Sequence, residues 1–363
     1  MQSKRYQQLT DSALRRELIS TELSQWVLTG ENVDLLKLLD AAFTVRKHFV
    51  GMDVSLHIIN NAQNGFCPED CHYCPQAKSS KSEIEEYPLK SENEILKEAE
   101  DAYKKGAHRY CMVFAGRGPS ERRVRQLSDL IHKIKSKYPI EVCVSAGLLD
   151  EQKAQTLKQA GLDRLNHNLN TSEKNYANIC TTHTYQDRID TLNAGRRAGL
   201  QLCSGVIVGM DESIQDIITL ARTLREFAVE SIPVNFFIPV DGHQVNRMTK
   251  LSPEYCLRVL CLFRLMNPDA EIRIAAGREL HLRQMQVLGL YPANSLFLDG
   301  YLNTRGDETL QTLQMITDAG FQIKSDVHLD EILTHLKENK TSPMPKFNAE
   351  QLLKTQVELR PHR

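Results

Sequence analysis

Two features are missing from this sequence of 363 residues: a long apolar run and an excess of charge of either sign. No stretch approaches the roughly 18 consecutive apolar residues that a membrane-spanning helix needs. The start, "MQSKRYQQLTDSALRREL", is polar and lacks the apolar core of a secretory signal. Lysine and arginine total 45 against 46 aspartates and glutamates, a formal net charge of -1. We therefore expect a cytoplasmic protein with no general attraction to nucleic acid or to a membrane surface.

The nine cysteines are not expected to form a disulfide framework, because the chain is long and carries no secretory signal. Reduced thiols then remain as metal ligands, nucleophiles or small core residues. An apolar content of 41% supports a full hydrophobic core. The length suits one large domain with extensions, or two smaller domains.

Short strand-like runs alternate with helix-like runs over most of the chain. The strand-like runs are "VSLHIIN", "HRYCMVF", "IEVCVSA", "DRLNHNL", "QLCSGVIVG", "SIPVNFFIPV", "EIRIAAG" and "NSLFLDG". Gly106, Gly161 and Gly199 stand where intervening helices should end. The alternation predicts an α/β fold, a (β/α)8 TIM-type barrel whose active face is formed by the loops after the strands. An open doubly wound sheet has the same alternation, and the number of strands favours the barrel.

We expect three parts along the chain: an N-terminal helical extension over residues 1–50, the barrel over residues 51–325, and a C-terminal helix with a short polar tail over residues 326–363. The extension contains two amphipathic segments, at about 6–28 and 33–49. The last part lies beyond the eighth strand–helix unit and contains prolines.

The motif "CPEDCHYC" places Cys67, Cys71 and Cys74 on one short loop after the first expected strand. Soft thiolates select iron–sulfur clusters, zinc or Cu(I). Three cysteines on a four-iron cube leave one iron open to a small molecule, the arrangement of the radical S-adenosylmethionine (SAM) enzymes. The alternatives are a structural zinc site completed by His72 or a distant ligand, and incidental thiols. The spacing favours iron–sulfur, because the sequence has no second C-x-x-C or H-x-x-x-H pair.

Several further blocks resemble the biotin synthase family. They are "YCMVFAGRGPSE", "LNHNLNTSEKNYANICTTHTYQDRIDTL", "LCSGVIVGMDES", "IPVNFFIPVDG", "IRIAAGRE" and "GLYPANSLFLDGYLNTRG", in order between about residues 30 and 322 together with the cysteine motif. The resemblance implies a radical SAM barrel enzyme, typically a homodimer, that inserts sulfur into dethiobiotin to form biotin. It also implies a [4Fe-4S] cluster on the three cysteines that cleaves SAM, a flavodoxin- or ferredoxin-type electron donor, and iron–sulfur assembly proteins as partners.

Cys111, Cys143, Cys203 and Arg273 fall on four different expected strands. Only a closed barrel would bring them to a common interior, because inward-facing side chains of different strands converge there. Taken singly, each cysteine suits a buried packing role, and a buried arginine suits an anion partner. The resemblance to biotin synthases implies instead that the four residues hold a [2Fe-2S] cluster whose bridging sulfide is the sulfur donor.

Asn166, Asn168 and Asn170 alternate in "NHNLN", so a regular strand would point all three amides to one face. Such amides need partners, and a ligand is one source; a turn-prone cluster at a strand end is the alternative. The remaining assignments rest on the resemblance. It implies that SAM contacts Asn168, Asn170 and Arg188, and that dethiobiotin contacts Arg109, Asn166, Asn235, Asn303 and Thr304. Tyr73 lies between two cluster ligands, where an aromatic side chain can pack near the adenine of SAM; a plain structural role is the alternative.

Some positions depart from the family pattern. Asn170 stands where many members have Asp, and the segments "NNAQNGFC" and "DGHQV" differ from the sequences that are more common in the family. Cys180 lies close to the expected active face; we interpret it as a passive thiol, with a further role at the site as the alternative. Two other functions stay open: a radical SAM enzyme that inserts sulfur into an octanoyl chain, like lipoyl synthases, and a zinc-stabilised binding protein.

Overall fold

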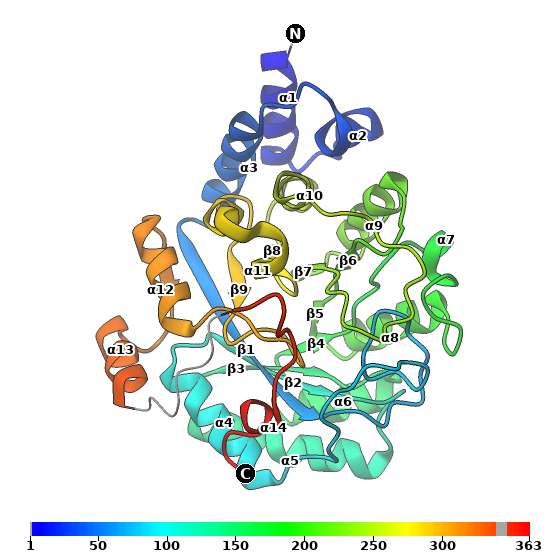
Figure 1. Ribbon diagram of the computed structural model, residues 1–363, viewed down its shortest axis with the longest axis vertical. Helices are drawn as coiled ribbons and strands as arrows, with labels where there is room; N and C mark the ends of the chain where they lie inside the picture. Colours follow the sequence, from blue (N-terminus) through cyan, green and yellow to red (C-terminus); the bar gives the residue numbers. More distant parts are fainter. Residues whose placement is uncertain (1, 339–346) are drawn as a thin grey trace.

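The computed structural model describes residues 2–338 and 347–363 and confirms a closed parallel barrel. Its strands are β1 (Asp53–Gln63), β2 (Arg109–Phe114), β3 (Glu141–Ser145), β4 (Arg164–Asn166), β5 (Gln201–Cys203), β6 (Val206–Val208), β7 (Ser231–Phe236), β8 (Glu271–Ile274) and β9 (Ser295–Phe297). Neighbouring strands pair in parallel from β1 to β5, and β5 and β6 both pair with β7. The ring continues through β8 to β9, which pairs with β1 and closes it. Figure 1 shows the helices around this barrel.

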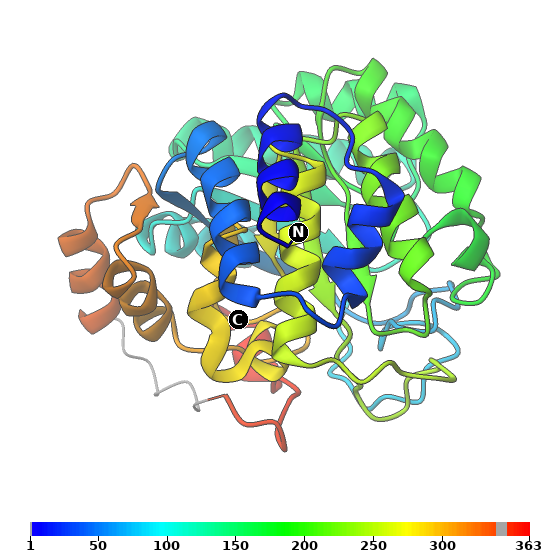
Figure 2. The same ribbon diagram turned by 90° about the horizontal axis from the view of Figure 1, so that it is seen from above.

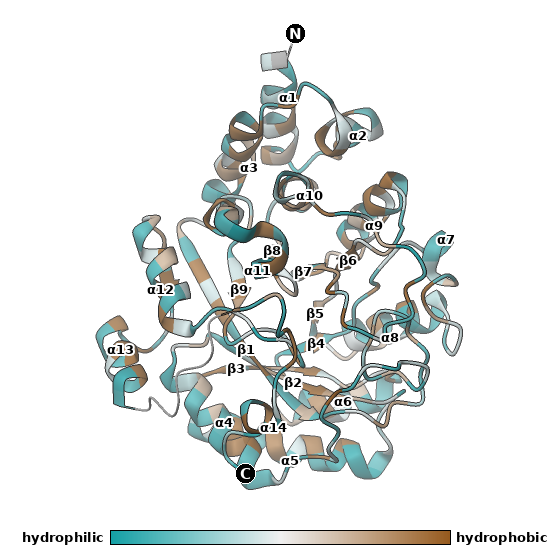
Figure 3. Ribbon diagram, in the orientation of Figure 1, coloured by the Kyte–Doolittle hydropathy of each residue, from teal (hydrophilic) through white to brown (hydrophobic). Residues whose placement is uncertain are grey.

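Helices alternate with the strands as the sequence predicts. Those around the barrel are α4 (Glu92–Lys104), α5 (Glu121–Lys137), α6 (Glu151–Gln159), α7 (Glu173–Tyr176), α8 (Tyr185–Arg197), α9 (Ile214–Glu226), α10 (Pro253–Met266), α11 (Arg278–Leu282), the 3-10 helix η1 (Arg283–Leu290) and α12 (Thr309–Asp318). Helix α5 shows the underlying pattern, since Val124, Leu127, Ile131 and Ile134 recur at helical spacing and are all buried. Its opposite face is charged, and Figure 3 shows hydrophilic and hydrophobic faces on these outer helices.

Three helices precede the barrel: α1 (Gln2–Leu14), α2 (Thr21–Thr29) and α3 (Leu35–Phe49). All three contact α10, which is buried on all sides from Cys256 to Met266. The views in Figures 1 and 2 both show these helices beside α10. Arg258 of α10 donates to the carbonyl oxygen of Gly30, which fixes the end of α2 against it. No helix in the described part of the chain is long and apolar enough to cross a membrane.

The C-terminal part folds back onto the barrel. Strand β10 (Gln322–Lys324) pairs with the start of β1, and α13 (Leu329–Glu338) follows it. Residues 339–346 of the expected polar tail lie outside the described residues. From residue 347 the chain runs across the mouth of the barrel, through the short helix α14 (Gln356–Leu359), as Figure 1 shows in red.

The expected single strand at 201–209 is interrupted at Ser204 and Gly205, where β5 ends and β6 begins. Both residues bind the loop after β4: Leu169 N donates to Ser204 Oγ at 3.1 Å, and Asn170 N donates to Gly205 O at 2.9 Å. A side chain at position 205 has no room, because a Cβ there would lie 1.9 Å from the carbonyl oxygen of Pro233. The break therefore shapes the neighbouring loop that carries the asparagines.

Gly205→Ala should destabilise the protein by about 1–3 kcal/mol, because the new methyl group must displace the backbone of β7. Gly289→Ala is the matched control, since its Cβ would meet mainly the terminal Cδ1 of Ile274, at 2.8 Å, which can rotate away. The free energy of unfolding in urea measures both. Equal losses for the two variants would contradict this account of the break.

Candidate active site

A cavity of about 290 Å³ opens at the carboxyl ends of the barrel strands, the face where barrel enzymes place their active sites. Nearly all of the predicted site residues line it. They are Cys67, Cys71, Tyr73, Cys74, Cys111, Cys143, Asn166, Asn168, Asn170, Arg188, Asn235, Arg273, Asn303 and Thr304. Of the other two, Cys203 lies directly beside Arg273 and Asn166, whereas Arg109 lies below the cavity floor. The chain thus gathers side chains from the whole length of the barrel around one space.

Cys67, Cys71 and Cys74 lie on the loop after β1 and face this cavity. Zinc–sulfur bonds of about 2.3 Å would hold the sulfurs of a single zinc site roughly 4 Å apart. The three Sγ atoms do not lie within 4.8 Å of one another in this part of the described structure. Three thiolates would leave one iron of a four-iron cluster open.

Acidic residues between these cysteines tie the loop to the segment before α8. The Asp70 carboxylate accepts from the backbone N–H groups of Thr181 and Thr182, at 2.9 and 3.1 Å. The Glu69 carboxylate accepts from the Thr182 hydroxyl at 2.6 Å. Burial opposes ionisation of Asp70, but the hydrogen bonds that its carboxylate accepts from Thr181 and Thr182 hold its pKa well below the usual range. The "PED" of the cysteine motif therefore fixes the loop that presents the thiols.

Cys180 lies beside this loop, close to the active face as expected from the sequence. Its Sγ is 3.8 Å from Cys71 Sγ and 3.3 Å from Nδ1 of His183. The hydrogen bond from Cys71 lowers the pKa of Cys180 to about 4. Cys71, Cys180 and His183 also form the one group with the spacing of a single-ion site among the residues that the structure describes. The structure thus places Cys180 in contact with a thiol of the cysteine motif, and its interpretation as a passive thiol stays a prediction.

The floor of the cavity carries the second set of thiols. Cys111 of β2 and Cys143 of β3 are register partners, and Cys203 of β5 is the register partner of Asn166 on β4. All three cysteines are buried. A hydrogen bond with Cys143 lowers the pKa of Cys111, although burial opposes the shift. The sequence prediction that a closed barrel brings these residues to a common interior is confirmed; their role as cluster ligands stays a prediction.

Arg273 of β8 completes this set. Its Nη1 points at Cys203 Sγ, 3.6 Å away, while its Nη2 donates to Ser231 Oγ at 2.7 Å and to Glu271. Its Nε is buried without a hydrogen-bond partner. Anchoring through Nη2 leaves the Nη1 side of the guanidinium directed at the thiols. That geometry fits a group held between the three cysteines and Arg273.

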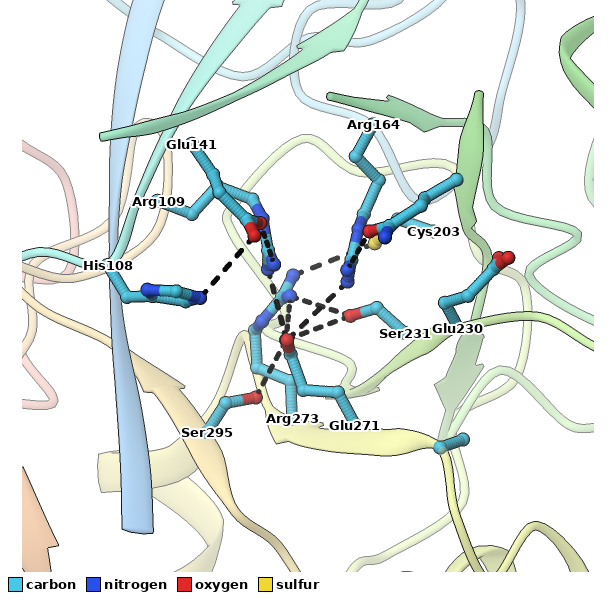
Figure 4. Close-up of polar contacts among 12 residues, drawn as sticks. His108, Arg109, Glu141, Arg164, Cys203, Glu230, Ser231, Glu271, Arg273 and Ser295 are labelled. Carbon is cyan, nitrogen blue, oxygen red and sulfur yellow. Dashed lines mark hydrogen bonds and ion pairs between the residues drawn. The ribbon is translucent and has the colours of Figure 1, made fainter. Parts of the chain in front are cut away.

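Glu271 is the centre of a buried charge cluster beneath this floor (Figure 4). Its carboxylate accepts from Arg109 at 3.1 Å, from Arg164 at 3.4 Å and from Arg273, and lies 3.1 Å from Nε2 of His57. Burial opposes ionisation, but the nearby Arg109, Arg273 and His57 hold the pKa of Glu271 well below its usual range. One carboxylate thus binds three guanidinium groups from three different strands.

The asparagines of "NHNLN" line the cavity without forming a regular strand. Strand β4 ends at Asn166, and Asn170 adopts a left-handed conformation with φ of 69°. Of the two alternatives left open by the sequence, a regular strand and a turn-prone cluster at a strand end, the backbone after Asn166 agrees with the second. Asparagine and aspartate tolerate this conformation better than most residues, which accounts for either one at position 170. Asn168 Oδ1 is buried without a hydrogen-bond partner, as a ligand-binding acceptor would be.

Arg188 reaches the cavity from the first turns of α8. Its Nη1 donates to the carbonyl oxygen of Asn168 at 2.7 Å, and its Nη2 lies 2.9 Å from Nε2 of His183. The Tyr73 hydroxyl, 3.4 Å from Nη2, accepts from the Asn170 amide at 2.6 Å. These contacts connect the cysteine loop, the asparagine segment and α8. The predicted SAM-binding residues therefore form one hydrogen-bonded group.

Asn303 and Thr304 line the opposite side of the cavity, in the turn after β9. The Asn303 amide is paired head to head with the Asn64 amide, at 2.6 and 3.0 Å. Asn235 of β7 is likewise engaged: its amide donates to Val206 O at 2.9 Å and accepts from Ala276 N at 3.2 Å. These side chains are thus held in place before any ligand arrives.

Sequence reasoning missed three residues of this site. Glu271 had a visible signal, because it stands two positions before Arg273 and so on the same face of the strand. His167 lines the cavity with a buried Nε2 that has no partner, and lay unnoticed between two asparagines. Asn64 was noted only as a departure from family wording; nothing local could show its pairing with Asn303, which is 239 positions away.

The fold and the cysteine loop define a radical SAM barrel. Residues 64–224 match the Radical SAM superfamily, and residues 233–322 match the Biotin and Thiamin Synthesis associated domain. Among solved structures, the FeFe-hydrogenase maturase HydG from Carboxydothermus hydrogenoformans superposes with a TM-score of 0.76, at 17% identity over 93% of this chain and 86% of that one. Methylornithine synthase gives 0.75, at 18% identity over 90% of this chain and 100% of that one. These two likenesses support the fold alone.

Closer relatives identify the family. Biotin synthase from Magnetococcus marinus is 52% identical over 87% of this chain and 98% of its own length. The biotin synthase of Acaryochloris marina is 55% identical over 84% of this chain and 88% of its own, and that of Bacillus subtilis is 44% identical over 88% and 96%. The chain belongs to the biotin synthase family.

Glu271→Gln should destabilise the cluster-free protein by about 3–5 kcal/mol, because it leaves three buried guanidinium groups without their shared anion. Glu141→Gln is the matched control: Glu141 binds Arg109 from the other side, and its side chain is 32% exposed against 13% for Glu271. We expect a clearly smaller loss there. Chemical unfolding of both variants measures the difference, and equal losses would argue against Glu271 as the central charge.

Proposed function

We propose that this chain converts dethiobiotin to biotin by radical SAM insertion of sulfur, the last step of biotin formation. The observation that carries the proposal is that two separate thiol sets face one cavity. Cys67, Cys71 and Cys74 lie at its mouth, and Cys111 and Cys143 line its floor beside Cys203 and Arg273. A structural zinc site needs only one such set.

The mouth cysteines would hold a [4Fe-4S] cluster, and the floor cysteines with Arg273 would hold a [2Fe-2S] cluster. When bound, the first cluster supplies the electron that cleaves SAM, and the second supplies the sulfur atom. The Nε of Arg273 has no hydrogen-bond partner, and its Nη1 points at Cys203 Sγ. Both observations support a bound cluster between Arg273 and the cysteines. Guanidinium is a weak metal ligand, so we propose that Arg273 contributes charge and position as well as a ligand atom.

The chain's own side chains would orient both small molecules. We propose that Arg188 pairs with the SAM carboxylate through a charge-assisted hydrogen bond. Asn168, with its unpartnered Oδ1, and Asn170 would bind ribose hydroxyls, and Tyr73 would pack beside SAM on the cysteine loop.

Dethiobiotin would lie between the SAM residues and the floor. We propose that Asn166 and Asn235 face its ureido ring, and that Asn303 and Thr304 receive its carboxylate. Arg109 has both ends of its guanidinium bound to Glu141 and Glu271, so we propose that it acts on substrate through the shape of the floor. Asn166 and Asn235 already have partners within the protein, and their remaining hydrogen-bonding capacity suits a cyclic urea better than an octanoyl chain, which offers no polar group to them.

The remaining assignments extend the family resemblance. We propose a flavodoxin- or ferredoxin-type electron donor, iron–sulfur assembly proteins that rebuild the floor cluster, a homodimer, and a cytoplasmic location.

The two thiol sets should separate in function. Cys67→Ala should abolish 5′-deoxyadenosine release, because it removes a ligand of the cluster that cleaves SAM. Cys203→Ala should abolish biotin while 5′-deoxyadenosine release continues, because its side chain belongs to the floor. Cys261→Ala is the control, since this thiol is fully buried in α10, away from the cavity. Both products are measured by liquid chromatography after anaerobic reconstitution with iron and sulfide.

Biotin formation by the Cys203→Ala variant at the unchanged rate would contradict the assignment of the floor. Continued release of 5′-deoxyadenosine by the Cys67→Ala variant would contradict the assignment of the mouth.

A further inference from the structure

Residues 351–360, which we name the C-terminal strap, lie against residues 299–306, the substrate turn. Arg305 N donates to Leu352 O and Lys354 N donates to Asn303 O, both at 2.8 Å. Thr304 and Leu353 also form a β-bridge. In Figure 1 the strap crosses in front of β9 and β1 at the mouth of the barrel. The chain's end is therefore paired through its backbone with the turn that lines the cavity.

Two ion pairs fix the C-terminal end of the strap. Glu358 binds Arg305 of the substrate turn through two parallel bonds of 2.8 and 2.9 Å, with side chains 13% and 12% exposed. Arg360 binds Glu94, at the start of α4, through two bonds of 2.9 Å. Bidentate pairs of this kind, largely withdrawn from water, hold their geometry better than single surface contacts. The strap thus links the substrate turn to the helix that follows the cysteine loop.

The substrate turn needs an external brace because its backbone is unfavourable by itself. Asp299 has φ of 59° and Leu302 has φ of 48°, a left-handed conformation that is costly for a side chain such as leucine. The strap offsets the cost of this backbone conformation by binding the carbonyl oxygens of Asp299 and of Asn303, the residue after Leu302. Lys354 Nζ donates to Asp299 O at 2.6 Å, and Lys354 N holds the carbonyl oxygen of Asn303. Residues in such conformations persist only where their surroundings hold them.

We infer that the C-terminal strap is a positioning element for substrate: it holds Asn303 and Thr304 where they receive the carboxylate end of dethiobiotin. The inference rests on the proposed function. None of the strap's side chains is required to touch substrate, so the strap sets affinity through the turn. SAM binds across the cavity, on Arg188 and the asparagine segment, and its affinity should not depend on the strap.

The test is a charge reversal in the full-length, reconstituted holoenzyme. Glu358→Arg places two cations together and should weaken dethiobiotin binding about tenfold, the loss expected for one misplaced hydrogen-bonded contact. SAM binding should stay within about twofold. Arg305→Glu combined with Glu358→Arg restores opposite charges and should recover most of the affinity. Glu350→Arg, the same substitution at an exposed position just outside the strap, is the control and should bind like wild type.

Equilibrium dialysis with labelled dethiobiotin, in the presence of SAM, measures each affinity. Glu358→Gln, which removes the pair without repulsion, replaces Glu358→Arg if the reversed variant does not fold, and should weaken binding several-fold. Unchanged dethiobiotin affinity in the folded variant would overturn the inference, and so would an equal loss of SAM affinity. If wild type itself binds no dethiobiotin, the proposed function fails instead, which separates the two conclusions.

Discussion

The carboxylate of Glu271 is the interaction on which the barrel floor depends. Arg109, Arg164 and Arg273 come from β2, β4 and β8, and their guanidinium groups converge on this one anion (Figure 4). Buried cations without a partner would cost several kcal/mol each. Because the anion is shared, the three strands are held at fixed distances, and Arg273 keeps one face directed at Cys203. The same charge cluster therefore balances the buried charges of the floor and positions Arg273 beside Cys203.

The two thiol sets are supported in different ways: the floor thiols lie on strands, and the mouth thiols lie on a loop. The floor thiols belong to strands whose register fixes them: Cys111 lies opposite Cys143, and Cys203 lies opposite Asn166. The mouth thiols belong to a loop held by the hydrogen bonds that the Asp70 carboxylate accepts from the backbone N–H groups of Thr181 and Thr182. A donor of sulfur must sit at a fixed distance from substrate, whereas a loop site leaves room for SAM to enter. The strand positions of the floor thiols thus suit the proposed sulfur donation, and the loop position of the mouth thiols suits the proposed cleavage of SAM.

Much of this architecture could be predicted from the sequence, because strand alternation and helix-ending glycines are local signals. Convergence of the floor cysteines followed from barrel closure alone. Long-range pairings could not be predicted: the Asn64–Asn303 amide pair and the Arg305–Glu358 ion pair join distant segments without a periodic pattern. The sequence also left open whether Asn170 continues a strand or lies in a turn, since its left-handed backbone is paired through a hydrogen bond with the strand break at residue 205. The sequence thus located the site but could not predict the long-range contacts that hold its side chains in place.

The central claim is that the floor residues hold the sulfur that enters the product. The direct test is to rebuild the floor cluster with isotopically heavy sulfide, remove free sulfide, allow one turnover with dethiobiotin and SAM, and determine the mass of the biotin formed. We predict heavy biotin, at about one molecule per protomer, with matching loss of heavy sulfide from the protein. Unlabelled biotin, formed while the heavy sulfide stays in the protein, would contradict the account and direct attention to Cys180 as a persulfide carrier.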